Sequence, residues 1–177
     1  CRVKNANHTY MMNFFVYTAG LFAYWLIGFA IQMGGAAGNS NLGGLQPLSS
    51  EFTISMFGKT WGLFGQNGML LTGHSYDVGV MVIFLFEMVF MDTALTIVTG
   101  ACAERWKFAT FAVTSVIMGA LTYPLFGNWA WGAGWLSQLG TNLGLGKGYC
   151  DFAGSGVVHS VGGITALAVC LIVGPRI

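Results

Sequence analysis

Residues 78–102 read VGVMVIFLFEMVFMDTALTIVTGAC, and this stretch decides the fold class. An α-helix needs about 20 mostly apolar residues to cross the hydrocarbon core of a bilayer. This stretch is long enough and contains only two acidic residues, Glu87 and Asp92. Three more stretches qualify, at about residues 10–33, 108–126 and 153–173. We therefore predict an all-α polytopic membrane protein with about four transmembrane helices.

The composition supports this prediction and excludes nucleic acid as a partner. Hydrophobic residues make up 55% of the chain and charged residues 7%, whereas roughly a quarter of the residues in a soluble domain are charged. Seven basic and six acidic residues leave a formal charge of +1, so no basic face is available to attract nucleic acid. We expect the apolar helices to contact membrane lipid instead.

The four cysteines show neither metal-ligand nor disulfide spacing; they are Cys1, Cys102, Cys150 and Cys170. We interpret them as structural or incidental residues. No other pattern in the sequence indicates a metal site, a cofactor or enzyme activity, so we expect none of these.

Three links join the apolar stretches. Residues 34–77 are rich in Gly, Ser and Asn and are too polar to span the membrane; we expect an exposed loop with a short helix near residues 50–57. Residues 103–107 are few and charged, so the two helices that they join are expected to be antiparallel neighbours. The third link, residues 127–150, carries three tryptophans.

Basic residues predict the orientation of the helices, because Lys and Arg in short loops stay on the cytoplasmic side. Five of the seven fall at one set of helix ends, namely Arg2, Lys4, Arg105, Lys107 and Arg176, which leaves Lys59 and Lys147 for the other. The first and third stretches then run outward, and the second and fourth run inward. The tryptophan-bearing link faces the outside, at the depth where aromatic rings favour the membrane interface.

Ionisable side chains at membrane depth are candidates for function, because each costs several kcal/mol unless it is paired or hydrated. Four qualify: Glu87, Asp92, Asp151 and His159. For His159 the residues leave two interpretations open, a neutral imidazole bonded to a neighbouring helix or a ring that passes a small polar solute or a proton along a narrow path. Asp151 is placed to cap the last helix through its free N–H groups, and its charge also favours cations at the outer mouth.

Aromatic residues form the second group of candidates. Phe86 and Phe90 are one turn apart on the predicted second helix, a spacing that is more typical of core residues than of a binding site. Trp131 in the outer link is either an interfacial anchor or a ring that meets a cation, a contact worth about 0.5–2 kcal/mol.

Several motifs resemble those of the Amt/Mep/Rh ammonium transporters, in the same order and with the same separations across most of residues 1–177. They are GACAER with WKF (100–108), FGNWAWG (126–132), DFAGSGVVH (151–159) and GPR (174–176). The resemblance implies a pore between two inverted five-helix repeats, in a homotrimer in the cell membrane. The predicted helices resemble the second to fifth helices of that fold, so residues 1–177 are expected to be an incomplete transporter domain without the first helix and the second repeat. Inverted repeats place the path at their interface.

The resemblance also implies roles for individual residues. Trp131 resembles the aromatic that receives ammonium at the outer vestibule, and Asp151 the aspartate that shapes this site without touching the ion. Phe90 resembles one of two stacked phenylalanines that gate the path below the receiving site, the other being expected in the missing half; Phe86, one turn away, is grouped with this gate. His159 resembles the first of two histidines that line an apolar pore. Ammonium is then deprotonated before passage, because neutral ammonia crosses an apolar tube at a far lower cost than the ion.

Two acidic residues depart from this scheme. Glu87 stands where the family commonly has Gln: protonated, it resembles the amide, and ionised, it places a charge near the path. Asp92 is unusual at membrane depth, and we expect a buried hydrogen bond to a neighbouring helix. The Glu87 departure leaves an alternative open, a membrane sensor that binds ammonium and signals to a fused cytoplasmic domain. A cytoplasmic regulatory protein is a further expected partner.

Overall fold

The computed structural model describes residues 1–39 and 45–175 of the chain. Within these residues, four helices are long and apolar enough to cross a membrane: Val3–Gly38, Val78–Cys102, Phe108–Ala130 and Ser155–Val173. The prediction of four transmembrane helices is therefore confirmed. The first begins earlier and the third ends later than the sequence predicted, because both ends continue in polar or aromatic residues that remain helical. Helices satisfy every backbone group internally, as a bilayer requires.

Three of these helices change winding along their length. The first comprises α1 (Ala6–Ala23), a π-helical turn (Tyr24–Gly28) and α2 (Phe29–Met33). The third comprises α4 (Phe108–Ile117), a π-helical turn (Met118–Thr122) and α5 (Tyr123–Ala130). The fourth begins with a π-helical turn (Ser155–Ser160) and continues as α7 (Val161–Val173). Pro124 follows the second of these turns, where a wider turn makes room for its ring.

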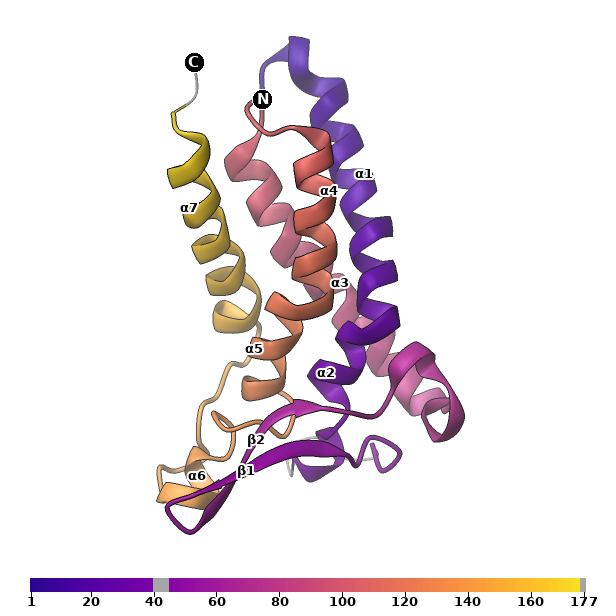
Figure 1. Cartoon of the computed structure of the whole chain (residues 1–177), viewed down its shortest axis with the longest axis vertical. Coiled ribbons are helices and arrows are strands. Elements are labelled where there is room, and N and C mark those ends of the chain that lie inside the picture. The colour runs from indigo at the N-terminus through magenta and orange to yellow at the C-terminus, as the bar shows by residue number, and fades with distance from the viewer. Residues whose placement is uncertain (40–44, 176–177) are drawn as a thin grey trace.

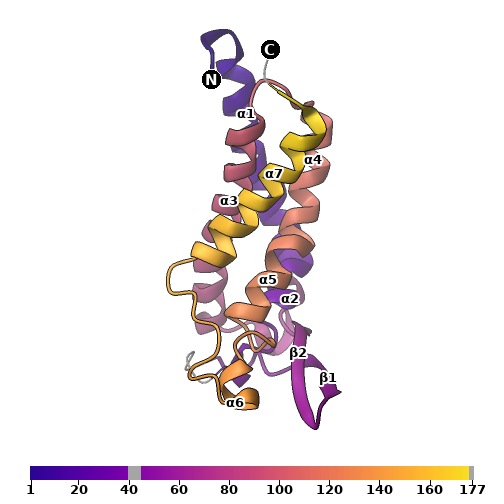
Figure 2. The same ribbon diagram turned by 90° about the vertical axis from the view of Figure 1, so that its left-hand side faces the viewer.

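The helices form one bundle, and different connecting segments lie at its two ends (Figure 1). The chain's first residues and the link between α3 (Val78–Cys102) and α4 lie at one end, where Arg2 Nε is 3.0 Å from a Glu104 carboxylate oxygen. At the other end lie the strands and α6 (Leu139–Leu143). Viewed from the side, α7 crosses in front of the bundle (Figure 2), and it packs chiefly on α3. Arg2, Lys4, Arg105 and Lys107 thus share one end, as predicted, while Arg176 lies outside the described residues.

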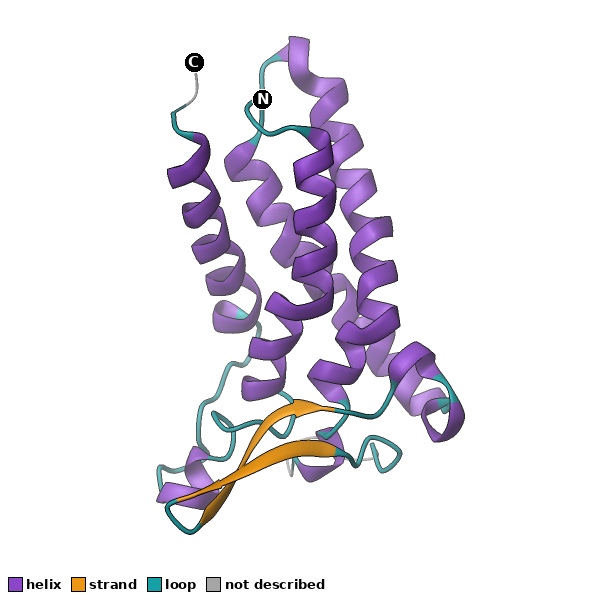
Figure 3. Cartoon of the chain, in the orientation of Figure 1, coloured by secondary structure: helices purple, strands orange, loops and turns teal. Residues whose placement is uncertain are grey.

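The link 34–77 contains a β-hairpin where we expected a short helix near residues 50–57, so that expectation was wrong. Strand β1 (Glu51–Met56) pairs antiparallel with β2 (Lys59–Gly65), with Met56 opposite Lys59. Figure 3 shows both strands at the end of the helical bundle. Phe57 and Gly58 form the two-residue turn with φ values of 54° and 69°, which is the conformation that right-twisted hairpins favour. Residues 40–44 of this link lie outside the described residues.

Small residues let the first and third transmembrane helices approach closely. A Cβ atom on Gly28 would lie 2.2 Å from the carbonyl oxygen of Gly119, and one on Gly119 would lie 2.7 Å from that of Gly20. Both contacts involve backbone, which cannot rotate away as a side chain can. Close backbone approach of this kind is a main source of helix association in membranes.

Substituting Gly28 by Ala is expected to destabilise the bundle, because the added methyl group must push the two helices apart. Overpacking of this kind costs about 1–3 kcal/mol, which should appear as a lower melting temperature of the full-length protein in detergent. Gly100→Ala is the matched control, since a Cβ atom there meets nothing within 4 Å. Equal melting temperatures for the two variants would contradict this account of the helix contact.

Candidate functional site

Asp151 lies directly before the fourth transmembrane helix, and its carboxylate organises the start of that helix. Oδ1 accepts hydrogen bonds from the backbone N–H of Gly154 at 2.9 Å and from Ser155 Oγ at 3.2 Å. Oδ2 accepts from the backbone N–H of Gly156 at 2.8 Å and of Val157 at 2.6 Å. The residue is 7% exposed. The structure therefore places Asp151 in the capping role that the sequence indicated, with both oxygens occupied by protein donors.

Trp131 is fixed to the same residue through the backbone. It follows the last residue of α5, and its indole Nε1–H donates to the carbonyl oxygen of Asp151 at 2.6 Å. The indole stands edge-on to Phe90 of α3, with ring centroids 5.9 Å apart. Phe90 in turn stands edge-on to Phe86 at 4.8 Å. Three elements distant in sequence thus bring Trp131, Phe90, Phe86 and Asp151 together.

His159 lies on the turn whose first N–H groups Asp151 binds. It belongs to the π-helical stretch Ser155–Ser160, and its side chain is exposed on the surface of the described chain. Among the described residues no hydrogen bond holds its ring. The backbone N–H of His159 donates to the carbonyl oxygen of Gly154 at 2.9 Å, so the position of the residue depends on the geometry that Asp151 sets.

Glu87 lies on the interior side of α3, in a buried polar cluster. Gln32 Nε2 donates to Glu87 Oε2 at 2.6 Å, and the Tyr123 hydroxyl donates to the same oxygen at 3.2 Å. The Tyr24 hydroxyl donates to Gln32 Oε1 at 2.8 Å. All four side chains are at most 5% exposed. The cluster joins the first, second and third transmembrane helices, so the carboxyl group is held by protein donors inside the bundle.

Asp92 does not make the hydrogen bond that we expected. Its Oδ1 is buried and has no hydrogen-bond partner among the described residues. Two hydroxyls near it in sequence bond within their own helix, since Thr93 Oγ1 donates to Val89 O at 2.8 Å and Thr96 Oγ1 to Thr93 O at 2.9 Å. No donor from a neighbouring helix of the described chain reaches this oxygen, so the expected hydrogen bond is absent among the described residues.

Glu51 forms a second polar site, where the hairpin meets the helix ends. Asn128 Nδ2 donates to Glu51 Oε2 at 3.2 Å and to the carbonyl oxygen of Gln32 at 3.1 Å. Glu51 Oε1 and Asn128 Oδ1 are buried without a partner among the described residues. Burial raises the pKa of Glu51 from 4.5 to about 7, against the lowering effect of the Asn128 hydrogen bond. The Glu51 carboxyl group therefore links β1 to α5 through Asn128. Its raised pKa makes the protonation of this link depend on pH near neutrality.

Other hydrogen bonds tie the hairpin to the segment that carries Trp131. Trp129 Nε1 donates to the carbonyl oxygen of Leu63 at 2.9 Å, and the backbone N–H of Trp135 donates to that of Gly62 at 2.9 Å. Asn39 Nδ2 donates to the carbonyl oxygen of Trp131 at 2.8 Å. Residues 127–150 and the hairpin thus form a hydrogen-bonded layer over the helix ends.

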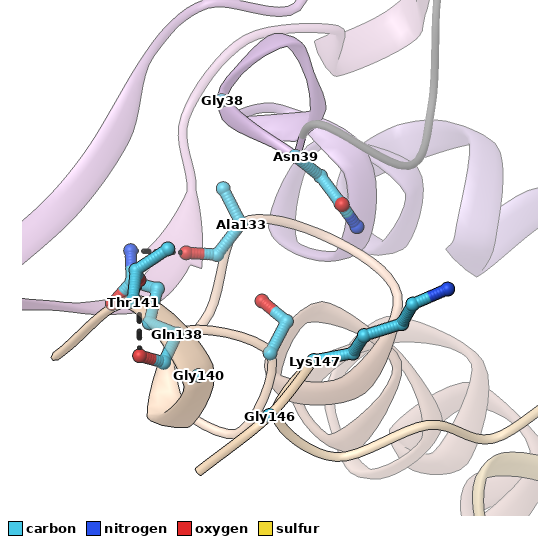
Figure 4. A pocket seen from close by; sticks show the side chains of 9 residues that line it. Gly38, Asn39, Ala133, Gln138, Gly140, Thr141, Gly146 and Lys147 are labelled. Atoms are coloured by element: carbon cyan, nitrogen blue, oxygen red, sulfur yellow. Dashed lines mark hydrogen bonds between the residues drawn. The ribbon is translucent and has the colours of Figure 1, made fainter. Parts of the chain in front are cut away.

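An open cavity of about 310 Å³ lies in this layer, apart from the aromatic residues. Polar side chains at its wall include Asn39, Gln138, Thr141 and Lys147 (Figure 4). Gln138 Nε2 donates to the carbonyl oxygen of Ala133 at 2.7 Å, and Thr141 Oγ1 donates to that of Gln138 at 3.1 Å. None of the site residues predicted from the sequence lines this cavity, so the assembly of Trp131, Phe90, Phe86 and Asp151 is the better candidate site.

Sequence reasoning missed Gln32, Tyr24 and Tyr123 as partners of Glu87, and Asn128 as the partner of Glu51. One signal was present: Gln32 is a polar residue within an apolar helix, and such a residue must find a partner in the bundle. The identity of that partner, 55 residues away in the chain, depends on how the helices pack.

Comparison with known proteins places the whole chain in one group. The model of the Ammonium Transporter Family matches residues 1–177. The chain is 39% identical to Ammonium transporter Amt2 of Archaeoglobus fulgidus, and the match covers 99% of this chain and 33% of the relative. It is 36% identical to Ammonium transporter 1 member 1 of Oryza sativa subsp. japonica, covering 99% of this chain and 31% of the relative. The chain thus spans about a third of the length of these curated relatives.

A solved structure shares the fold. The structure titled Sensor Amt Protein superposes with a TM-score of 0.74 at 31% sequence identity. The superposition covers 99% of this chain and 38% of that one.

Glu51 predicts a pH-dependent stability. Between about pH 4.5 and 7 the unfolded chain releases the proton that the folded protein retains, so the folded state binds more protons and its stability falls as pH rises through this window. Above pH 7 both states are ionised and the penalty is constant. Glu51→Gln should remove the part of the pH dependence of stability that comes from this carboxyl group. The melting temperatures of the full-length protein at about pH 5.5 and about pH 8 should therefore differ less in the variant than in the wild type.

Glu104→Gln is the control for this comparison. The Arg2 backbone N–H and side chain lower the pKa of Glu104 from 4.5 to about 2. Its contribution to stability is therefore present above about pH 4.5 and is lost only as pH falls below that value. Glu104→Gln should shift both melting temperatures equally. If the melting temperature of Glu51→Gln changes with pH as much as that of the wild type, Glu51 is not the source of this pH dependence.

The polar cluster around Glu87 predicts a cost for removing one donor. Tyr123→Phe keeps the ring and deletes the hydroxyl, so a buried carboxyl oxygen loses one of its two hydrogen bonds, at a cost of about 1–3 kcal/mol. We expect a lower melting temperature of the full-length protein. Tyr10→Phe is the matched control, because Tyr10 is 66% exposed. A loss for Tyr123→Phe no larger than for Tyr10→Phe would show that the cluster does not hold the helices together.

Proposed function

This chain belongs to the Ammonium Transporter Family, and we propose that it supplies part of one of the two repeats that together form a pore for ammonium across the cell membrane. In this proposal ammonium is received at the Trp131 ring and gives up its proton before it passes the Phe90 and Phe86 gate as ammonia. The proton is relayed across the membrane separately, so that net charge moves. The observation that carries the proposal is the placement of Trp131, held by its hydrogen bond to Asp151 and standing edge-on to Phe90.

The chemistry of these groups suits a cation that must lose its charge before it enters an apolar path. A ring face attracts ammonium through a cation–π contact, which is worth about 0.5–2 kcal/mol. The ring does not take the proton of the ion. Asp151 is not free to bind the ion directly, because four donors occupy its carboxylate. Its role in the proposal is to position Trp131 and the helix that carries His159, while its negative charge favours cations nearby.

His159 lines the pore in this proposal. Its side chain is exposed on the described chain, and we propose that the second repeat of the family fold faces it across an apolar path. A neutral imidazole there donates and accepts hydrogen bonds as ammonia passes. The apolar side chains exposed elsewhere, such as Phe14 at 73% and Ile172 at 85%, are available for membrane lipid, for that repeat and for the other subunits of a homotrimer.

A second candidate is a membrane sensor that binds ammonium and signals to a cytoplasmic domain or regulatory protein. Two observations favour it: the solved structure that shares the fold is titled Sensor Amt Protein, and the buried Glu87 cluster joins three helices through hydrogen bonds. A cluster of this kind transmits a change in one helix to its neighbours. Binding of ammonium without flux by the full-length protein would favour this candidate over transport.

Current through proteoliposomes tests the transport proposal. The full-length protein should give a saturable current on an ammonium jump, and Trp131→Leu should raise the half-saturating concentration about 2- to 30-fold, because the cation–π contact is lost. Trp131→Phe restores an aromatic face and should recover part of this loss. Trp135→Leu, in the same outer link, is the matched control and should leave the current unchanged.

Two results would contradict the proposal. One is the absence of any current from folded wild-type protein. The other is a half-saturating concentration that changes as much in Trp135→Leu as in Trp131→Leu.

A further inference from the structure

Two cysteines that are 68 residues apart in the chain meet where α3 packs on α7. Cys102 is the last residue of α3, Cys170 belongs to the last turn of α7, and their sulfur atoms are 3.9 Å apart. Cys102 is fully buried, and Cys170 is half-buried. The other cysteines, Cys1 and Cys150, are exposed. The incidental interpretation from sequence spacing does not explain this contact.

A guanidinium group is fixed against one of the two sulfurs. Arg105 Nη2 donates to Cys170 Sγ at 3.1 Å and to the carbonyl oxygen of Ala101 at 2.9 Å, and Nη1 donates to the carbonyl oxygen of Gly174. These bonds join the end of α3 to the end of α7 and hold a positive charge at Cys170. A cation beside a partly accessible sulfur is the environment in which cysteines react with oxidants.

We propose that Cys102 and Cys170 are an oxidation-sensitive pair that a peroxide converts into an intramolecular disulfide, and that this bond locks α3 to α7. The thiolate of Cys170 attacks one oxygen of hydrogen peroxide, the O–O bond breaks, and hydroxide leaves, giving a sulfenic acid. The sulfur of Cys102 then attacks the sulfenic sulfur, the S–O bond breaks, and one water is released. The hydroxide from the first step takes up the proton that the Cys170 thiol released, and the hydroxyl that leaves the sulfenic sulfur takes the proton of Cys102. The two sulfurs are oxidised by two electrons in all, and the peroxide is reduced to two waters.

The geometry requires little movement for the second step. A disulfide has an S–S length of about 2.05 Å, so the sulfurs must approach by about 1.9 Å, which rotation of the two side chains supplies in part. Cys170 is the less buried of the two residues and has the cationic neighbour, so we expect it to be oxidised first, with buried Cys102 as the resolving partner. The pair lies at the end of the bundle that the basic residues predict to be cytoplasmic, where disulfides are transient and redox-sensing rather than permanent.

The lock acts on the two helices that carry the candidate site. Phe86 and Phe90 lie on α3, and the turn that Asp151 caps leads directly into α7. A covalent bond at the far end of these helices restricts their relative tilt. The proposal concerns the chemistry of the pair and does not depend on whether the protein transports or senses ammonium.

The test uses the full-length protein in which Cys1 and Cys150 are replaced by Ser, so that the exposed thiols do not contribute. Treatment with hydrogen peroxide should lower the mass of the protein by two hydrogens, and peptide mapping without reductant should recover a cross-link between Cys102 and Cys170. The melting temperature should rise, and dithiothreitol should reverse both changes. With Cys102→Ser the cross-link is lost and Cys170 should instead accumulate as the sulfenic acid, which a dimedone-type reagent traps.

Arg105→Gln probes the cationic neighbour, and we expect the cross-link to form several-fold more slowly in this variant. The proposal is overturned if peroxide leaves both thiols intact under conditions that oxidise Cys1 in the wild type. It is equally overturned if Cys170 is converted to the sulfinic acid while Cys102 remains a thiol, or if the cross-link forms without a change in melting temperature.

Discussion

The arrangement of the candidate site depends on one buried residue, Asp151, through both its carboxylate and its backbone carbonyl. Asp151 binds the N–H groups at the start of the fourth transmembrane helix through its side chain and the indole of Trp131 through its backbone. Helix N-termini leave N–H groups without partners, and a hydrogen-bonded anion is favourable there because the helix dipole is positive at that end. One residue therefore satisfies the helix start and holds the aromatic ring against Phe90.

The same constraint governs the polar groups elsewhere in the bundle. A buried polar atom costs free energy unless a partner satisfies it. Glu87 finds donors on two other helices, so a carboxyl group that is unusual in a membrane segment becomes a link between helices. Asp92 Oδ1 has no partner among the described residues. Glu51 lies between these two cases, because one of its oxygens accepts a hydrogen bond and the other has no partner among the described residues. Burial favours its protonated form, so the contact between the hairpin and α5 depends on pH.

The sequence predicted the four helices because the length of an apolar stretch determines whether it crosses a bilayer. It also predicted the cap at Asp151, since capping depends on residues close in the chain. The hairpin at residues 51–65 was missed, because Phe57-Gly58 is a weak turn signal and the link was judged only as too polar to span. The partners of Glu87 and the pairing of Cys102 with Cys170 were missed for another reason: both depend on helix packing between residues far apart in the chain. Trp131 and Phe90 are in contact, but the receiving role of Trp131, the gating role of Phe90 and the pore-lining role of His159 all rest on resemblance to a family and remain predictions.

A structure of the full-length Asp151→Ala variant in lipid nanodiscs, compared with the wild type, tests the central claim most directly. The account predicts that the turn at Ser155–Ser160 loses its regular winding. Because the carboxylate also fixes the backbone of residue 151, its carbonyl oxygen is expected to move, and the Trp131 ring that it holds should leave its edge-on contact with Phe90. An unchanged turn and an unchanged ring position in the variant would contradict the claim that Asp151 builds the site.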